Sequence, residues 1–193
     1  MYSKARTPPW GCLVAVTVSI ALGQPLAAQA GSSNLSELKG EMKVFEAVIN
    51  ETIVQTFAPP FGLLEKAKGA YLPDFGVVFS LEVNLSPVRA LSLFNMQPLS
   101  KEELAKARKT QLERLGIIKT TVPRLLAEHA GGLRDVSSDE FLAVVVHLFP
   151  PLDEDQKPPS QIVLEVKKSD LDQYSGGKLS YGEFEKKVRI LEL

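Results

Sequence analysis

The stretch DQYSGGKLSYGEF at residues 172–184 has the frame of a calcium-binding EF-hand loop. With Asp172 at position 1, Gly177 falls at position 6, Leu179 at 8, Ser180 at 9 and Glu183 at 12. A carboxylate at position 1, a glycine at 6 and a glutamate at 12 suit the oxygen ligands and the sharp turn that Ca²⁺ binding requires. Asp172, Ser180 and Glu183 are therefore candidate metal ligands, and weak calcium binding is one hypothesis for this chain.

The same stretch departs from the EF-hand pattern at two ligand positions, which hold Tyr174 and Gly176. The preceding QIVLEVKK is β-branched and alternating, whereas an EF-hand loop follows a helix. An alternative needs no metal: Gly176 and Gly177 form a turn, and Ser180 with Glu183 forms a capping box that starts a short helix.

Two histidines, His129 and His147, are the other candidates for chemistry. His147 interrupts the apolar stretch VVVHLF, and a buried imidazole needs hydrogen-bond partners. As a general base it would need a carboxylate, for which Glu82 on an earlier strand is the candidate. The alternative is a hydrogen-bonded structural histidine. His129 lies beside Glu128 at a helix end, where the helix dipole favours a capping role.

Residues 1–30 have the three parts of a secretory signal peptide. Lys4 and Arg6 are the basic part, residues 11–22 form an apolar run too short to span a bilayer, and A-Q-A at 28–30 is a cleavage motif. We expect a mature domain of residues 31–193 in the periplasm or outside the cell; a retained N-terminal anchor is the alternative. Cleavage would remove Cys12, the only cysteine, and would exclude thiol catalysis and cysteine-ligated metal.

The charge balance argues against nucleic acid as a partner. The chain has 22 basic and 23 acidic residues, and loss of residues 1–30 leaves 20 basic residues and a net charge of about −3. Such a chain has no general attraction to nucleic acids or anionic membranes.

Helical periodicity is clear near the N-terminus. Five apolar residues recur at spacings of three and four, with Ser33 or Asn34 available as N-cap: Leu35, Leu38, Met42, Phe45 and Ile49. This pattern predicts an amphipathic helix. The following stretch at 58–69, APPFGLLEKAKG, is typical of a loop.

Strict alternation follows in AYLPDFGVVFSLEVNLSP at 70–87 and predicts a strand with one buried face. Its polar side carries Ser80, Glu82 and Asn84, and its apolar side carries Phe75, Val77, Phe79, Leu81, Val83 and Leu85. Pro73 and Asp74 suit a turn, Gly76 suits a bulge, and residues 70–72 form a short partner strand or a lead-in. Through this YLPxxGVxF strand after an N-terminal helix, the chain resembles a group of small exported bacterial proteins. The resemblance implies export and supplies no active site.

The second half predicts more helix and two further strands. Ser100 and Glu103 form a capping box before a helical region that runs towards Gly131-Gly132, where Pro123 either kinks one helix or begins a second. Residues 141–149 are apolar on both faces, as in a covered central strand, and 161–168 alternate. These two should pair antiparallel across a surface loop at 150–160. The predicted class is α+β: a single, mostly antiparallel sheet with N-terminal, central and short C-terminal helices packed on it.

The leading functional hypothesis is a soluble exported protein that binds a protein or an envelope component rather than an enzyme. No G-x-S-x-G, H-E-x-x-H, Walker or G-x-G-x-x-G motif occurs, and no cofactor is expected. The contact would use an exposed sheet edge or the polar face with Ser80, Glu82 and Asn84. A hydrolase that uses His147 with a carboxylate is the alternative from a different class.

Overall fold

The computed structural model describes residues 27–85, 100–149 and 159–193, with the side chains of 27–34 left out. Its elements are α1 (Ala27–Thr56), β1 (Gly62–Leu72), β2 (Gly76–Asn84), α2 (Lys101–His129), a short 3-10 helix η1 (Ala130–Gly132), β3 (Phe141–Leu148), β4 (Gln161–Lys167), α3 (Lys168–Ser175), α4 (Tyr181–Glu185) and β5 (Arg189–Glu192). The predicted α+β class is confirmed. Residues 1–26 of the predicted signal peptide and 150–158 of the predicted surface loop lie outside the described residues.

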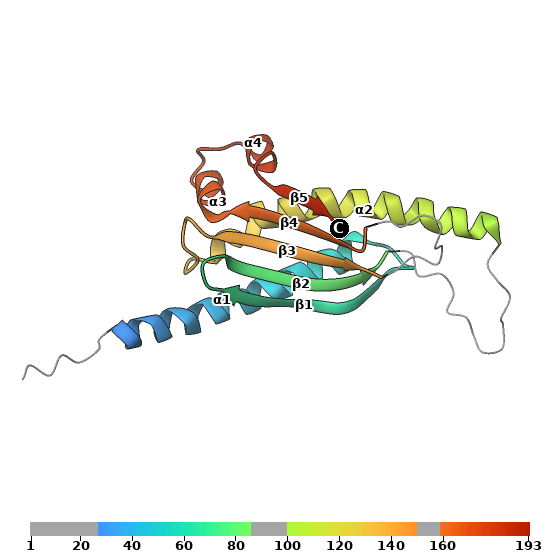
Figure 1. Ribbon diagram of the computed structural model, residues 1–193. Coiled ribbons are helices and arrows are strands. Elements are labelled where there is room, and N and C mark those ends of the chain that lie inside the picture. Colours follow the sequence, from blue (N-terminus) through green and yellow to red (C-terminus); the bar gives the residue numbers. More distant parts are fainter. Residues whose placement is uncertain (1–26, 86–99, 150–158) are drawn as a thin grey trace, which may run out of the picture.

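One five-stranded sheet has the order β1-β2-β3-β4-β5. β2 and β3 are parallel, and the other three neighbouring pairs are antiparallel. The sheet is therefore mostly antiparallel, and β3 and β4 pair as predicted. A parallel pair requires a crossover connection, and the chain between β2 and β3 contains α2. Both long helices lie on the same side of the sheet (Figure 1).

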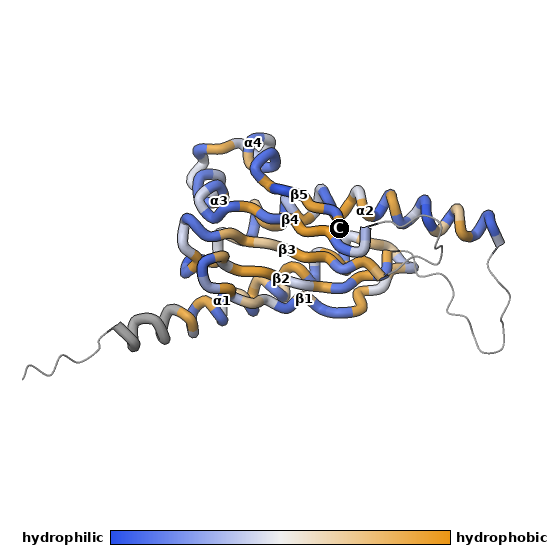
Figure 2. The backbone as a smooth tube through the Cα atoms, in the orientation of Figure 1, coloured by the Kyte–Doolittle hydropathy of each residue, from blue (hydrophilic) through white to orange (hydrophobic). Residues whose placement is uncertain are grey.

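The core lies between that helical layer and the sheet. α1 contributes Leu38, Met42, Phe45, Ile49 and Ile53, which are all buried. The apolar side chains predicted to face inward in and just after β2 are also buried from Val77 to Leu85, whereas Phe75 before β2 is only partly buried and stacks on Phe141. Figure 2 shows hydrophobic residues following the central strands. Leu35 is instead exposed, and the predicted N-cap at Ser33 or Asn34 is wrong because α1 already begins at Ala27, in an alanine-rich stretch that favours helix.

α2 is a single helix that contains Pro123. Its first turn has the predicted capping box: Glu103 N–H donates to Ser100 Oγ at 3.2 Å, and Ser100 N–H donates to Glu103 Oε2 at 2.9 Å. Pro123 is buried on the side that packs on the core. No helix in the described ranges is long and apolar enough to cross a membrane.

The N-terminal edge of the sheet corrects the prediction of a loop at 58–69. Most of this stretch belongs to β1, an 11-residue edge strand whose exposed Lys66 and Lys68 hid the strand signal. Its pairing with β2 shifts register on both sides of Glu65, so the bulges lie in β1 and not at Gly76 as predicted. Gly76 has φ +122°, and a Cβ there would meet the Phe141 carbonyl oxygen at 2.2 Å, so only glycine fits.

Two further elements were not predicted. β4 runs directly into α3, and the chain ends on β5, which pairs with β4. Residues 141–148 form the middle strand of the sheet, as predicted. Leu142, Val144 and Val146 face the helices, whereas the other side is only partly covered, because Ala143 is buried there but Val145 is only partly buried.

Candidate functional site

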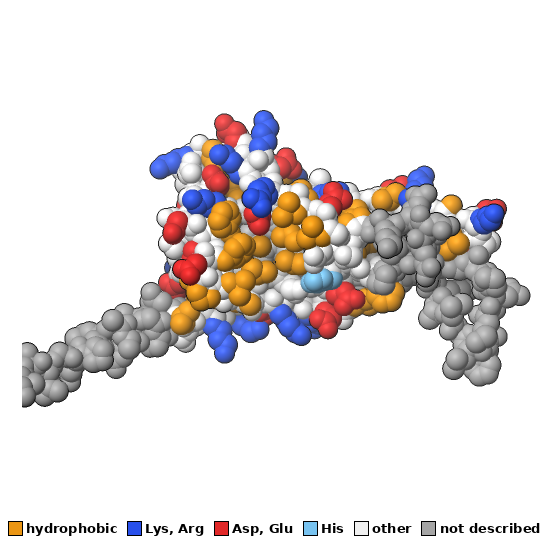
Figure 3. Space-filling view, viewed as in Figure 1, with side chains coloured by type: hydrophobic (Ala, Val, Ile, Leu, Met, Phe, Trp, Pro, Cys, Tyr) orange, Lys and Arg blue, Asp and Glu red, His pale blue; other side chains and the backbone are white. Residues whose placement is uncertain are grey.

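The sheet face opposite the helices is uncovered by any described element, and we call it the open face. Its centre is apolar because alternate residues of three adjacent strands place small and β-branched side chains there. Val78 of β2 pairs with Ala143 of β3, and Val145 of β3 pairs with Val163 of β4. Leu191 of β5 continues the row beside Val163. Figure 3 shows a hydrophobic patch across the middle of this face.

Polar residues occupy the end of the open face where β2 and β3 finish. Glu65, Glu82, His147 and Gln161 form one row across β1, β2, β3 and β4. His147 is exposed rather than buried, so the expected burial of its imidazole is wrong. The physical reason is that His147 falls on the uncovered side of β3, where solvent reaches the ring. In Figure 3 the histidine lies beside acidic side chains at this end.

The structure gives His147 a partner that the sequence reasoning did not assign to it. His147 Nε2 lies 3.1 Å from Ser80 Oγ, which is within hydrogen-bond distance. Glu82 is the register partner of His147, as the hydrolase hypothesis requires, but no ion pair between the two is found within the described ranges. The alternating pattern had placed Ser80 and Glu82 on one face. The contact between Ser80 and His147 could not be predicted because the sequence does not show which strand lies beside β2.

Basic residues lie towards the other end of the open face, on β4 and β5. Arg189 pairs with Glu165 at 2.9 Å, and 68% of the Arg189 side chain is exposed. Lys167 is exposed next to Phe141 in the row at the start of β3. The open face thus has an apolar centre, one end with Glu65, Glu82, His147 and the exposed Lys68 of β1, and an opposite corner where Lys167 and Arg189 lie near Glu165.

The two edges of the sheet differ in how far they can pair with another strand. At β1, Ala67 N–H donates to Asn50 Oδ1 and Gly69 N–H donates to Glu46 Oε1, both at 2.8 Å. These two side chains of α1 occupy donors that an added strand would need. β5 at the opposite edge has only four residues, so the open face is the larger contact surface.

The residues of the EF-hand frame belong to a helix–turn–helix. Asp172 lies inside α3 and pairs with Lys168, and Gly177 takes φ +71° in the turn. Glu183 Oε2 accepts hydrogen bonds from Ser180 N–H at 2.9 Å and from Ser180 Oγ at 2.7 Å. The Ser180 side-chain hydrogen bond, followed by the backbone one, holds the pKa of Glu183 below its ordinary value.

The capping-box alternative therefore describes the local geometry of this segment. Across the described ranges, no group of three or more His, Cys, Asp or Glu side chains is arranged to hold a metal ion. Calcium binding by Asp172, Ser180 and Glu183 remains a prediction for titration.

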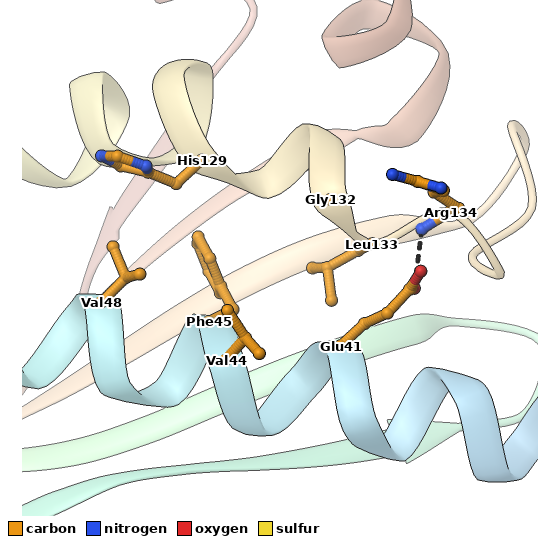
Figure 4. Close-up of a pocket in the computed structure, with 8 residues that line it drawn as sticks. All are labelled: Glu41, Val44, Phe45, Val48, His129, Gly132, Leu133 and Arg134. Atoms are coloured by element: carbon orange, nitrogen blue, oxygen red, sulfur yellow. Dashed lines mark hydrogen bonds between the residues drawn. The ribbon is translucent and has the colours of Figure 1, made fainter.

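A pocket of about 390 Å³ lies on the helical layer, between α1 and the end of α2 (Figure 4). Its floor is apolar, and His129 and Arg134 flank it, with Arg134 N–H donating to Glu41 at 2.8 Å. His129 Nε2 lies 3.9 Å from Glu128 Oε2 in the last turn of α2. The lining residues are Glu41, Val44, Phe45, Val48, His129, Gly132, Leu133 and Arg134. Because basic and acidic groups both line it, charge does not select one class of ligand.

No protein-family model, curated protein or solved structure shows a significant match to this chain, so the open face and its Ser80–His147 contact are interpreted from their geometry.

Proposed function

We propose that this chain is an exported protein that binds another protein through its open face. The supporting observation is the cluster of partly exposed Val78, Val145 and Val163, on three adjacent strands at the centre of that face. The solvated face of such a sheet normally carries polar side chains, and clustered exposed apolar residues mark interaction surfaces. The signal-peptide features of residues 1–30 support export, and the partner would be another exported protein or an envelope component.

Site-specific photo-crosslinking tests this proposal. The mature chain would carry p-benzoylphenylalanine in place of Val163 on the open face, or in place of Val54, which is 54% exposed on α1, as the matched control. After irradiation in the exported fraction of the source cells, we expect a defined protein adduct from position 163 and none from position 54. Identical adduct patterns at the two positions would contradict binding through the open face.

Hydrolysis is a second candidate function, favoured by the contact of 3.1 Å between Ser80 Oγ and His147 Nε2. In that reaction the imidazole takes the hydroxyl proton while Oγ bonds to an ester carbonyl carbon, and the departing alcohol receives the proton. Water then releases the acyl group and restores the serine. This geometry supplies a nucleophile and a base, and Glu82 is the residue nearest in register that could orient the ring.

Two variants test the hydrolase candidate with p-nitrophenyl acetate as the probe. Ser80→Ala and His147→Ala should each remove any hydrolysis above the buffer rate while leaving the melting temperature nearly unchanged, because both side chains lie on the open face. Asn84→Ala, further along the same polar side of β2, is the control. Equal rates in all of these proteins would rule out catalysis at Ser80.

A further inference from the structure

We propose that the partner of the open face is a second copy of this chain, packed face to face about a two-fold axis. This inference depends on the proposed function, because it requires that the open face binds protein. The two claims remain separable, since a face that binds a different protein would satisfy the first and not the second.

Charge is unevenly placed on the open face. Glu65 and Glu82 are register partners, and like charges directly opposite each other on neighbouring strands are destabilising. The exposed Lys68, at the register position of Ser80, is the nearest cation on this face, and a partner that brings further cations to this end would relieve the repulsion more fully. The free chain already carries exposed cations on the same face, at Lys167 and Arg189.

The Glu65–Glu82 pair and the two cations Lys167 and Arg189 occupy diagonally opposite corners of the open face. The row of Lys167 and the row of Glu82 are six residues apart along the strands, which is about 20 Å, and β2 lies three strand spacings from β5, which is about 14 Å. A two-fold axis that lies in the plane of the contact, along the other diagonal of the face, places Glu65 and Glu82 of each copy on Lys167 and Arg189 of the other. The two sheets then cross at close to a right angle, which is one of the two common ways in which sheets pack.

The surface between these corners is apolar. Val78, Val145 and Val163 place short, partly exposed side chains around the buried Ala143, which suits another sheet better than a single inserted side chain. Arg189 stays available although it pairs with Glu165, because a guanidinium has five N–H donors and most of this one is exposed.

The size of the face sets the expected strength. Five strands about 4.8 Å apart and about 20 Å long give a footprint of about 500 Å² per copy. The total of about 1,000 Å² is at the small end of specific interfaces. We therefore expect a weak dimer that forms as the protein concentration is raised, and association should be measured across micromolar to millimolar concentrations.

Single-cysteine crosslinking tests the geometry on the mature chain, from which the predicted cleavage removes Cys12. Val145→Cys lies at the centre of the open face, and Val54→Cys on α1 is the matched control. With a short bis-maleimide, the purified Val145→Cys protein should give a covalent dimer and the Val54→Cys protein should not. Equal or absent dimer formation in both would overturn the face-to-face arrangement.

A charge exchange measured by sedimentation equilibrium tests the pairing of corners. Glu82→Lys places like charges at both symmetry-related contacts and should weaken the dimer about tenfold. Adding Lys167→Glu to that variant should restore the affinity, which a merely structural effect of Glu82→Lys would not do. Failure of the second substitution to restore association would overturn the proposed register.

The outcomes also separate this inference from the proposed function. Self-association that follows the charge exchange supports the inference. A chain that stays monomeric at every concentration, but whose position 163 crosslinks to a different protein in the exported fraction, overturns it and leaves the proposed function standing. A monomer without any adduct overturns both.

Discussion

The link between α1 and the edge strand β1 predicts that Glu46→Ala will destabilise the fold more than the same substitution at any exposed glutamate of that helix. The Glu46 carboxylate accepts a hydrogen bond of 2.8 Å from Gly69 N–H across 23 residues of sequence, and only 11% of its side chain is exposed. Alanine would leave the Gly69 N–H without this acceptor beneath the helix. This single contact attaches α1 to the edge of the sheet, so its loss should lower the stability of the whole fold.

The size of the loss follows from the environment of each partner. A hydrogen bond to a charged group contributes about 1.5–3 kcal/mol. The ion pair of Glu46 with Lys43 adds little, about 0.5 kcal/mol or less, since 64% of the lysine side chain is exposed. We therefore expect Glu46→Ala to lower the free energy of unfolding by about 2–3 kcal/mol, or the melting temperature by about 5–10 °C for a domain of this size.

Thermal and urea unfolding of the mature chain measure this effect. Glu51→Ala is the control, because Glu51 is exposed five residues further along α1 and both substitutions gain the same helix propensity. Hydrogen exchange gives a local readout: the Gly69 amide should exchange faster in Glu46→Ala and not in Glu51→Ala. Equal stability of the two variants would refute the reasoning that α1 caps this edge.

Three further predictions concern other parts of the fold. Gly69→Ala should destabilise by about 1–3 kcal/mol in urea unfolding, because its Cβ would lie 2.8 Å from the buried Phe79 ring as well as from the Met42 methyl. Gly116→Ala in α2, where nothing lies within 4 Å of the added Cβ, should instead stabilise by about 0.5–1 kcal/mol. The hydrogen bonds from Ser180 lower the folded pKa of Glu183, so their contribution to stability is present above the ordinary pKa of 4.5 and is lost as pH falls through the folded pKa. The melting-temperature difference between wild type and Glu183→Gln should therefore shrink in acid. A difference that stays constant with pH would contradict this. If the EF-hand frame binds Ca²⁺, millimolar calcium should raise the melting temperature and Glu183→Ala should abolish the rise.

Local patterns in the sequence were sufficient for the central elements. Alternation from Val77 to Leu85 correctly identified the buried side of β2, and Ser100 with Glu103 correctly marked the start of α2. These signals work because side-chain direction in a strand or helix repeats every few residues. The same locality explains the error at β1, where charged edge residues carry no apolar alternation.

The candidate site was only partly predictable. His147 and Glu82 were identified from residue type, and the structure places them side by side in register on adjacent strands. Ser80 as the partner of His147, and the solvent exposure of the imidazole, depended on which strand borders β2 and on which face the helices cover.

The sequence by itself determined the α+β class, the inward side of β2 and the capping boxes at α2 and α4, since each depends on residues within a few positions of one another. Only the tertiary structure decided that both long helices lie on one side, so that no described element covers the open face, and that Glu46 accepts a hydrogen bond from Gly69 at the edge. Strand order and helix placement minimise the exposed apolar area of the whole chain, and that sum cannot be evaluated within any one segment.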